Sequence, residues 1–133
     1  FEPLDELLNY LEIYNIKWGI VTNKPCRMTL KLLHKLNLDC PYVISGDTLG
    51  ARKPNPKPLY IACELMNIKS EDAIYVGDAC RDIKAGNDAN MTTITANYGY
   101  IKHEDDTNAW GADFNATSPS HLSNLVKNLL GEF

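Results

Sequence analysis

Val76-Gly77-Asp78-Ala79-Cys80-Arg81-Asp82 joins a strand to a helix and is the most informative stretch of this chain. The apolar run Ala73–Val76 predicts a buried strand, which places Asp78 at its carboxyl end, where open α/β sheets bind ligands. Asp82 follows one helical turn later on the same side, within reach of the same ion or its waters. Two carboxylates at a strand end suit a hard cation such as Mg²⁺. The simpler interpretation is that one aspartate caps the helix that follows.

Outward from this stretch, apolar strands alternate with amphipathic helices along the sequence. The alternation predicts right-handed βαβ units and hence a doubly wound α/β fold, a three-layer Rossmann-like parallel sheet with helices on both faces. We expect one domain over residues 1–133, with loops at Gly46–Pro58 and Asn97–Asp113. The predicted strands are Trp18–Val21, Tyr42–Ile44, Ala73–Val76 and Met91–Ala96, and the predicted helices are Leu4–Tyr14, Arg27–Leu36, Leu59–Met66, Arg81–Ala89 and a last one capped by Ser118 that ends near Leu130.

The composition is that of an ordinary globular protein, with 44% hydrophobic and 23% charged residues. A formal charge of −4 gives no electrostatic footprint for nucleic acid, although a local cleft can still attract a small phosphorylated molecule. No apolar stretch approaches the roughly 18 residues of a membrane span, and Phe1–Leu4 does not begin a signal peptide. The four cysteines form no C-x-x-C pair, which favours reduced thiols and a cytoplasmic location.

The alternation of strands and helices predicts that two further polar segments, Thr22-Asn23 and the loop with Lys53, lie near the aspartates. Thr22 and Asn23 end the first strand, where a hydroxyl and a backbone N–H can bind phosphate oxygens, although for these two residues taken alone a simple turn is the favoured interpretation. Lys53 lies in a proline-rich loop, Arg52–Pro58, whose prolines hold it in place at low entropic cost. A fixed ammonium beside two aspartates would offset their charge and attract phosphate, whereas the simpler interpretation is a solvated loop lysine.

In this order, the residues resemble the motifs of the haloacid dehalogenase superfamily of phosphohydrolases. Thr22 is similar to its second motif, Lys53 in Lys-Pro-Asn-Pro to its third, and Gly77-Asp78-x-x-x-Asp82 to its fourth. The resemblance covers nearly the whole chain. It implies a Mg²⁺-dependent phosphatase in which one aspartate forms an aspartyl-phosphate and another, two residues later, acts as acid and base.

The resemblance also implies a role for each matching residue. Asp78 would be the principal Mg²⁺ ligand, and Asp82 would hold the metal's waters or orient Lys53. Thr22 and the amide of Asn23 would bind the phosphoryl oxygens. Lys53 would stabilise charge on the nucleophile and on the phosphate.

Shorter strings point to a branch of that superfamily and to a small phosphorylated metabolite as substrate. Val21–Pro25, Ser45-Gly46-Asp47 and Tyr98–Ile101 resemble the phosphoglycolate phosphatases. Trp110–Asp113 is similar to relatives that act on N-acetylmuramic acid 6-phosphate. The helical cap domain that helps choose the substrate in this branch is absent from the sequence, so both substrates stay open.

One departure from the family pattern concerns the nucleophile. The first motif, D-x-D at a strand end, does not occur before Thr22, where the acids are Glu2, Asp5, Glu6 and Glu12. We therefore expect the carboxyl-terminal part of a phosphatase, a sheet that lacks its central strand, the nucleophile and the cap. A missing central strand would leave two unpaired edges, so we expect dimerisation or aggregation through them unless a partner covers them.

Three alternatives follow from the missing motif. The chain is a non-catalytic domain that binds Mg²⁺ and phosphate or merely folds, or a separate polypeptide supplies the first motif. A receiver-type signalling domain also places aspartates at strand ends, but it needs an acidic pair earlier in the chain. We expect the isolated chain not to hydrolyse phosphate esters.

Overall fold

The computed structural model describes residues 2–36, 39–46, 53–98 and 107–131. Within these residues helices and strands alternate almost without exception, as the sequence predicts. In chain order the elements are α1 (Glu2–Ile13), β1 (Ile20–Val21), α2 (Cys26–Lys35), β2 (Val43–Ile44), α3 (Lys57–Met66), the 3₁₀ turn η1 (Ser70–Asp72), β3 (Ile74–Gly77), α4 (Cys80–Asp88), β4 (Thr92–Ala96), the 3₁₀ turn η2 (Thr107–Trp110), β5 (Phe114–Ala116) and α5 (Pro119–Leu130).

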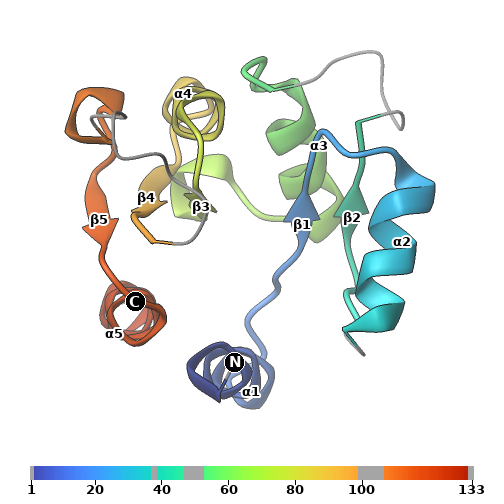
Figure 1. Cartoon of the computed structure of the whole chain (residues 1–133), viewed down its shortest axis with the longest axis horizontal. Helices are drawn as coiled ribbons and strands as arrows, with labels where there is room; N and C mark the ends of the chain where they lie inside the picture. The colour runs from blue at the N-terminus through green and yellow to red at the C-terminus, as the bar shows by residue number, and fades with distance from the viewer. Residues whose placement is uncertain (1, 37–38, 47–52, 99–106, 132–133) are drawn as a thin grey trace.

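The strands form two parallel sheets, β1-β2 and β3-β4-β5. Figure 1 shows α1 and α5 below the strands and α3 and α4 above them. The predicted class, α/β with parallel strands and helices on both faces, is therefore confirmed. None of the described helices is long and apolar enough to cross a membrane.

Two apolar clusters, one on each face of the strands, hold the layers together. Side chains alternate between the faces along a strand. On β4, Ile94 accordingly joins the first cluster, whereas Thr93 lies against Gly86 of α4, where an added Cβ would be 2.5 Å from its methyl group. The first cluster includes Leu7 and Leu11 of α1, Ala116 of β5 and Leu122 and Val126 of α5; the second includes Leu59 and Cys63 of α3, Ala85 of α4, Ala89 and Met91.

Some boundaries differ from the prediction for identifiable reasons. The strand β5 and the turn η2 were not expected, because Phe114-Asn115-Ala116 is too short to show an alternating pattern; its register against β4 forms it instead. Helix α3 begins at Lys57 rather than at Leu59, since Pro58 is compatible with a first helical turn. The cap of α5 is as predicted, with the Ser118 hydroxyl accepting from the N–H of His121 at 3.0 Å.

The strands β1 and β3 belong to different sheets, and an apolar cavity of about 560 Å³ lies between them. Val21 of β1 and Ile74 and Val76 of β3 line this cavity from its two sides. The sheet edge that each strand presents to the cavity has no strand beside it among the described residues. This agrees with the expected lack of a central strand.

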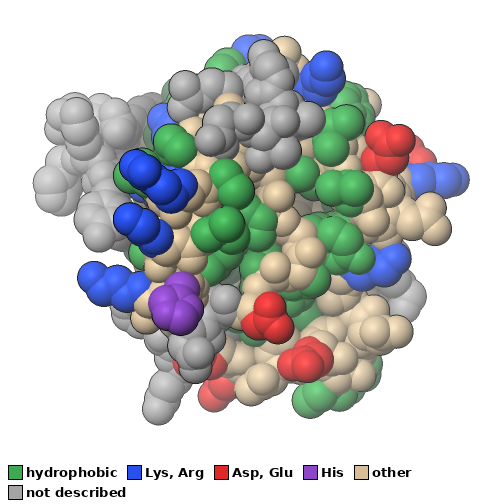
Figure 2. Space-filling model, turned by 90° about the vertical axis from the view of Figure 1, so that its right-hand side faces the viewer, with side chains coloured by type: hydrophobic (Ala, Val, Ile, Leu, Met, Phe, Trp, Pro, Cys, Tyr) green, Lys and Arg blue, Asp and Glu red, His purple; other side chains and the backbone are tan. Residues whose placement is uncertain are grey.

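A second apolar surface lies on the outer side of α2. Met28, Leu32 and Leu36 are spaced four apart and are each at least 44% exposed. Figure 2 views the molecule from this side and shows hydrophobic side chains gathered in the middle of the face. The expected self-association stays a prediction, and this face is a second surface from which it could arise.

Candidate functional site

Lys53 is the centre of a polar network that links the loop before α3 to both sheets. Its ammonium donates to Asp82 Oδ1 at 2.6 Å, to the hydroxyl of Tyr75 at 2.9 Å and to the carbonyl of Val21 at 3.1 Å. A lysine has three donors, so all of them are used. The side chains of Lys53 and Asp82 are each only 7% exposed. The lysine is therefore a fixed, buried cation and not a solvated loop residue.

Asp82 uses both of its carboxylate oxygens. Oδ1 binds Lys53, while Oδ2 accepts from the backbone N–H of Asp78 at 3.2 Å and of Ala79 at 3.1 Å. Asp82 therefore caps α4 from its third position and pairs with the lysine at the same time. This close packing needs Gly77, because a Cβ at that position would lie 2.3 Å from Cβ of Asp82.

Asn23 clamps the backbone of Lys53 with its side chain. Its Oδ1 accepts from the Lys53 N–H at 3.0 Å and its Nδ2 donates to the Lys53 carbonyl at 3.2 Å. The peptide bond from Lys53 to Pro54 is cis. The sequence assigned only the backbone amide of Asn23 a role, so this side-chain clamp was missed.

Thr22 and Asp78 lie beside this network at the carboxyl ends of β1 and β3. The Thr22 hydroxyl accepts from the N–H of Lys24 at 3.2 Å, the local turn that the sequence offered as the simpler interpretation. Asp78 is exposed, whereas Asp82 is buried. The structure thus brings Thr22, Asn23, Lys53, Asp78 and Asp82 to one end of the strands.

The described residues contain no group of three His, Cys, Asp or Glu side chains that could hold a metal ion. The carboxylate of Asp82 is directed at Lys53 and at two amides, and Asp78 is the carboxylate with an exposed side chain. Of the two roles expected for Asp82, this geometry favours orienting Lys53 over holding waters of a metal.

Tyr75 is a site residue that the sequence did not single out. Its hydroxyl accepts from Lys53 and donates to the Val21 carbonyl at 3.1 Å. Burial, with the nearby Asp82 charge adding to it, raises the pKa of Tyr75 well above its ordinary value, so the phenol stays neutral. A polar tip inside the apolar run Ala73–Val76 is the signal that could have found it.

The pKa of Tyr98, two residues after β4, is shifted in the same direction as that of Tyr75. Burial raises the pKa of its phenol, and the charge of Asp78 raises it further. The rest of the Tyr98–Ile101 string, and Asp47 of Ser45-Gly46-Asp47, lie outside the described residues.

The Trp110–Asp113 string lies at the opposite, amino-terminal end of the strands. There Asp113 Oδ2 accepts from the N–H of Thr93 at 2.9 Å, and the Thr93 hydroxyl donates to Asn87 Oδ1 at 2.8 Å. The Asn87 amide in turn donates to the Gly111 carbonyl at 3.0 Å. These residues fasten β5 to β4 and α4, so the geometry gives them a structural role.

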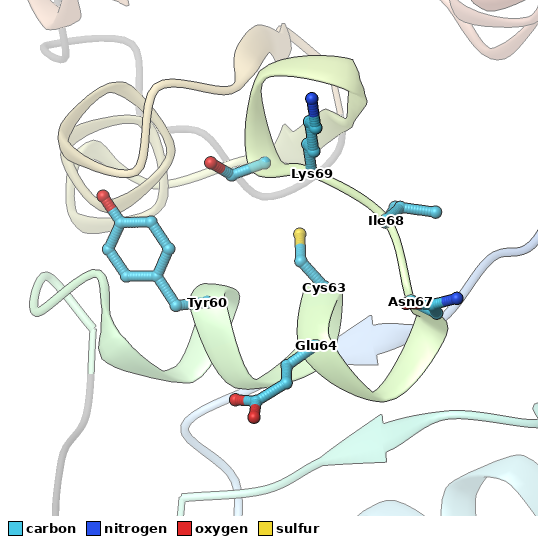
Figure 3. A pocket seen from close by; sticks show the side chains of 7 residues that line it. Tyr60, Cys63, Glu64, Asn67, Ile68 and Lys69 are labelled. Atoms are coloured by element: carbon cyan, nitrogen blue, oxygen red, sulfur yellow. The ribbon is translucent and has the colours of Figure 1, made fainter.

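A second cavity, of about 470 Å³, lies at the carboxyl end of α3 and beside η1. Figure 3 shows Tyr60, Cys63 and Lys69 around it. Burial raises the pKa of the Cys63 thiol, which disfavours the reactive thiolate. None of the residues of the Lys53 network lines this cavity.

The sequence and the fold were compared with those of known proteins. Residues 1–96 match the family described as haloacid dehalogenase-like hydrolase. The chain is 39% identical over 132 residues to N-acetylmuramic acid 6-phosphate phosphatase from Pseudomonas putida, covering 98% of this chain and 59% of that protein. It is 42% identical over 126 residues to phosphoglycolate phosphatase from Xylella fastidiosa, covering 92% and 55%.

Solved structures show the same fold. A hydrolase of this family from Deinococcus radiodurans, with bound phosphate and sodium, superposes with a TM-score of 0.82 at 20% identity, covering 97% of this chain and 59% of that one. The β-phosphoglucomutase from Clostridium difficile gives 0.77 at 20% identity, covering 98% and 56%. The chain spans between half and three-fifths of the length of these relatives.

Proposed function

The chain belongs to the haloacid dehalogenase-like hydrolase family, and we propose that its Lys53 site binds the phosphoryl group of a small phosphorylated metabolite for hydrolysis. The observation that carries this proposal is the buried ammonium of Lys53, oriented by Asp82 at 2.6 Å beside Thr22 and the exposed Asp78. A fixed cation at the carboxyl ends of parallel strands attracts a phosphate dianion. Phosphoglycolate and N-acetylmuramic acid 6-phosphate, on which the relatives are named to act, are the leading substrates.

Each residue receives a role that its surroundings support. The Thr22 hydroxyl and the Asn23 backbone amide bind phosphoryl oxygens. Lys53 offsets the charge that develops on the phosphoryl group, in the manner of other preorganised electrostatic sites. Asp82 and the Asn23 side chain are positioning residues that hold Lys53 from its ammonium and from its backbone.

The proposed cofactor is Mg²⁺, and the described residues fit it only in part. Asp78 would be a ligand, because its carboxylate is exposed at the edge of the site and Asp82 is engaged elsewhere. A magnesium ion is commonly held by one or two carboxylates together with waters and substrate phosphate. When bound, it would neutralise phosphate charge.

The proposed hydrolysis needs a nucleophilic aspartate at a strand end before Thr22, and residues 1–133 have no aspartate at such a place. Asp5, Glu6 and Glu12, the acids before Thr22 whose side chains are described, all lie on α1 and are exposed. We therefore propose that residues 1–133 alone do not turn over a phosphate ester. This observation also favours the second candidate, a domain that binds phosphate and Mg²⁺ without hydrolysis.

The experiment that tests the proposal measures phosphate release and phosphate binding separately. Release from a panel that includes the two leading substrates, with and without Mg²⁺, is expected to be absent for residues 1–133. Calorimetry is expected to detect inorganic phosphate binding, weakened at least about tenfold in Lys53→Met. Lys57→Met, a change at an exposed lysine four residues later, is the matched control. Equal binding by both variants would contradict the Lys53 site, and Mg²⁺-dependent release abolished in Asp78→Asn would contradict the missing nucleophile.

A further inference from the structure

Helix α2 has an apolar sector that the rest of the molecule covers only in part. Thr29 and Leu33 of this helix are buried. Met28, Leu32 and the C-cap residue Leu36 lie on one side of that buried strip and are 51%, 44% and 57% exposed. Residues four positions apart are neighbours on a helix, so these three side chains form a continuous apolar stripe at the surface.

A stripe of positive charge runs beside the apolar stripe. Arg27, Lys31 and Lys35 each precede one of its residues by one position, and all three are exposed. The sequence of α2 contains no Asp or Glu that could offset them. Figure 2 shows Lys and Arg side chains in blue beside the hydrophobic middle of this side of the molecule. We call the two stripes together the α2 face; it is apolar and basic.

Helix α1 presents the opposite charge on its outer side, while its inner side packs in the first apolar cluster. Asp5, Glu6 and Glu12 are exposed, and the sequence of α1 contains no Lys or Arg. Helical spacing places Ile13 among these three acids, and its side chain is 77% exposed. Tyr14, the next residue, is 64% exposed. These five residues form the α1 face, which is acidic around an apolar centre.

The α1 and α2 faces complement each other, but they do not pair within one molecule. The ion pairs among the described residues are Lys53–Asp82 and Lys84–Asp88, so none of them involves α1 or α2. Figure 1 shows α1 below the strands and α2 beside β2, at the edge of the molecule. Two complementary faces at different places on one chain can meet between two copies of that chain.

We propose that the α2 face of one copy docks on the α1 face of the next copy, so that the protein associates head to tail. The contact removes the apolar stripe and Ile13 from water, and the charges of opposite sign beside them favour this pairing over others. A symmetric contact of α2 on α2 is disfavoured, because it would bring Arg27, Lys31 and Lys35 against their own copies. A heterologous contact of this kind builds a closed ring or an open chain.

The test reverses the charge of one face at a time. Lys31→Glu with Lys35→Glu makes the α2 face acidic, and Glu6→Lys with Glu12→Lys makes the α1 face basic. Sedimentation velocity measures the weight-average mass against concentration at low salt. The mass of the unmodified chain is expected to rise with concentration, and to rise less in about 1 M NaCl, which screens the charges. The association constant of each reversed variant is expected to fall at least about tenfold, because its two faces then carry the same sign.

An equimolar mixture of the two reversed variants is the decisive measurement. The acidic α1 face of the first variant fits the basic α2 face of the second, so association is expected to return in the mixture. Its return also shows that both variants are folded. The matched controls, Lys57→Glu with Lys69→Glu and Glu64→Lys with Glu71→Lys, change the net charge equally at exposed positions outside both faces and are expected to associate like the unmodified chain.

The remaining outcomes contradict the head-to-tail contact. Association that persists in both reversed variants would place the contact at the unpaired sheet edges instead. A monomeric mixture of variants that circular dichroism shows to be folded would exclude complementary faces. An unmodified chain that stays monomeric but binds phosphatidylglycerol vesicles, with binding lost in Lys31→Glu with Lys35→Glu, would assign the α2 face to an anionic membrane surface. No phosphate ester is present, so none of these results bears on phosphate binding at Lys53.

Discussion

A polar network lies at each end of the strands: the Lys53–Asp82 pair at one end is buried, whereas at the other end Thr93 is buried but Asp113 and Asn87 are exposed. At the carboxyl end, Asp82 binds a buried ammonium, and the exposed Asp78 stands beside it. At the amino end, Asp113 receives the N–H of Thr93, and the Thr93 hydroxyl and Asn87 complete a network in which Asp113 is the one charged member. Both networks fasten secondary structure together.

The difference shows which network is available for a ligand. In the first network the ammonium of Lys53 lies at the same end of the strands as the exposed carboxylate of Asp78 and the hydroxyl of Thr22, so a bound phosphate could contact groups around it. In the second network, Asp113 accepts from the backbone N–H of Thr93 in β4, and Asn87 donates to the Gly111 carbonyl in the loop before β5. The Trp110–Asp113 string, which resembles a substrate-specific branch of the family, thus lies far along the strands from Lys53.

The largest effect is expected where charge is buried. Asp82→Ala removes the partner of a lysine that is 7% exposed and leaves the amides of Asp78 and Ala79 without an acceptor. Breaking a buried ion pair from one side costs about 3–5 kcal/mol. Urea denaturation measures the free energy of unfolding.

The matched control for this change is Asp88→Asn. Asp88 pairs with Lys84 at 3.1 Å, but the two side chains are 46% and 62% exposed. Surface pairs of this kind contribute less than about 1 kcal/mol. A similar loss in both variants would mean that the Lys53–Asp82 pair is no more important than a surface pair.

The network at the amino-terminal end of the strands is tested at Asp113. Asp113→Ala leaves the N–H of Thr93 without its acceptor in a residue that is fully buried. An unsatisfied buried donor costs about 1–3 kcal/mol. The affinity for inorganic phosphate is expected to stay unchanged under conditions where the variant is folded. A selective loss of phosphate affinity would place this network in the binding site after all.

A smaller effect is expected for the clamp on the lysine backbone. Asn23→Ala removes two hydrogen bonds to Lys53, with an expected loss of about 1–2 kcal/mol of stability. Phosphate affinity is expected to fall as well, because the lysine is then positioned by the contacts of its ammonium and no longer by the clamp on its backbone. Asn55→Ala, which removes a hydrogen bond to the N–H of Lys57 in the same loop, is the control for loop stability. An unchanged affinity in Asn23→Ala would show that the contacts of the Lys53 ammonium suffice to position it.

The features of the fold and the site that depend on local sequence patterns are predictable. Those that depend on contacts between residues distant in sequence are not. The strand before Asp78 and the cap at Ser118 follow from local patterns, so they were predicted. The side-chain contacts of Asn23 and Tyr75 bridge residues 30 and 54 positions apart, and no local pattern encodes them. The strand β5 was missed for the same reason, since its pairing with β4 is what forms it.

The last and smallest effect concerns Tyr75 and pH. An acid whose folded pKa is raised does not affect stability below its unfolded pKa, about 10 for tyrosine, because both states are then protonated. Above that value the unfolded state releases the proton and the folded state does not. The free energy of unfolding therefore falls as the pH rises past about 10. Urea midpoints between about pH 9 and pH 11 are expected to fall less steeply in Tyr75→Phe than in the unmodified chain. Tyr60→Phe, at a tyrosine that is 42% exposed, is expected to keep the original slope. Identical slopes in all three proteins would mean that the Tyr75 phenol is not confined between Lys53 and Val21 in solution.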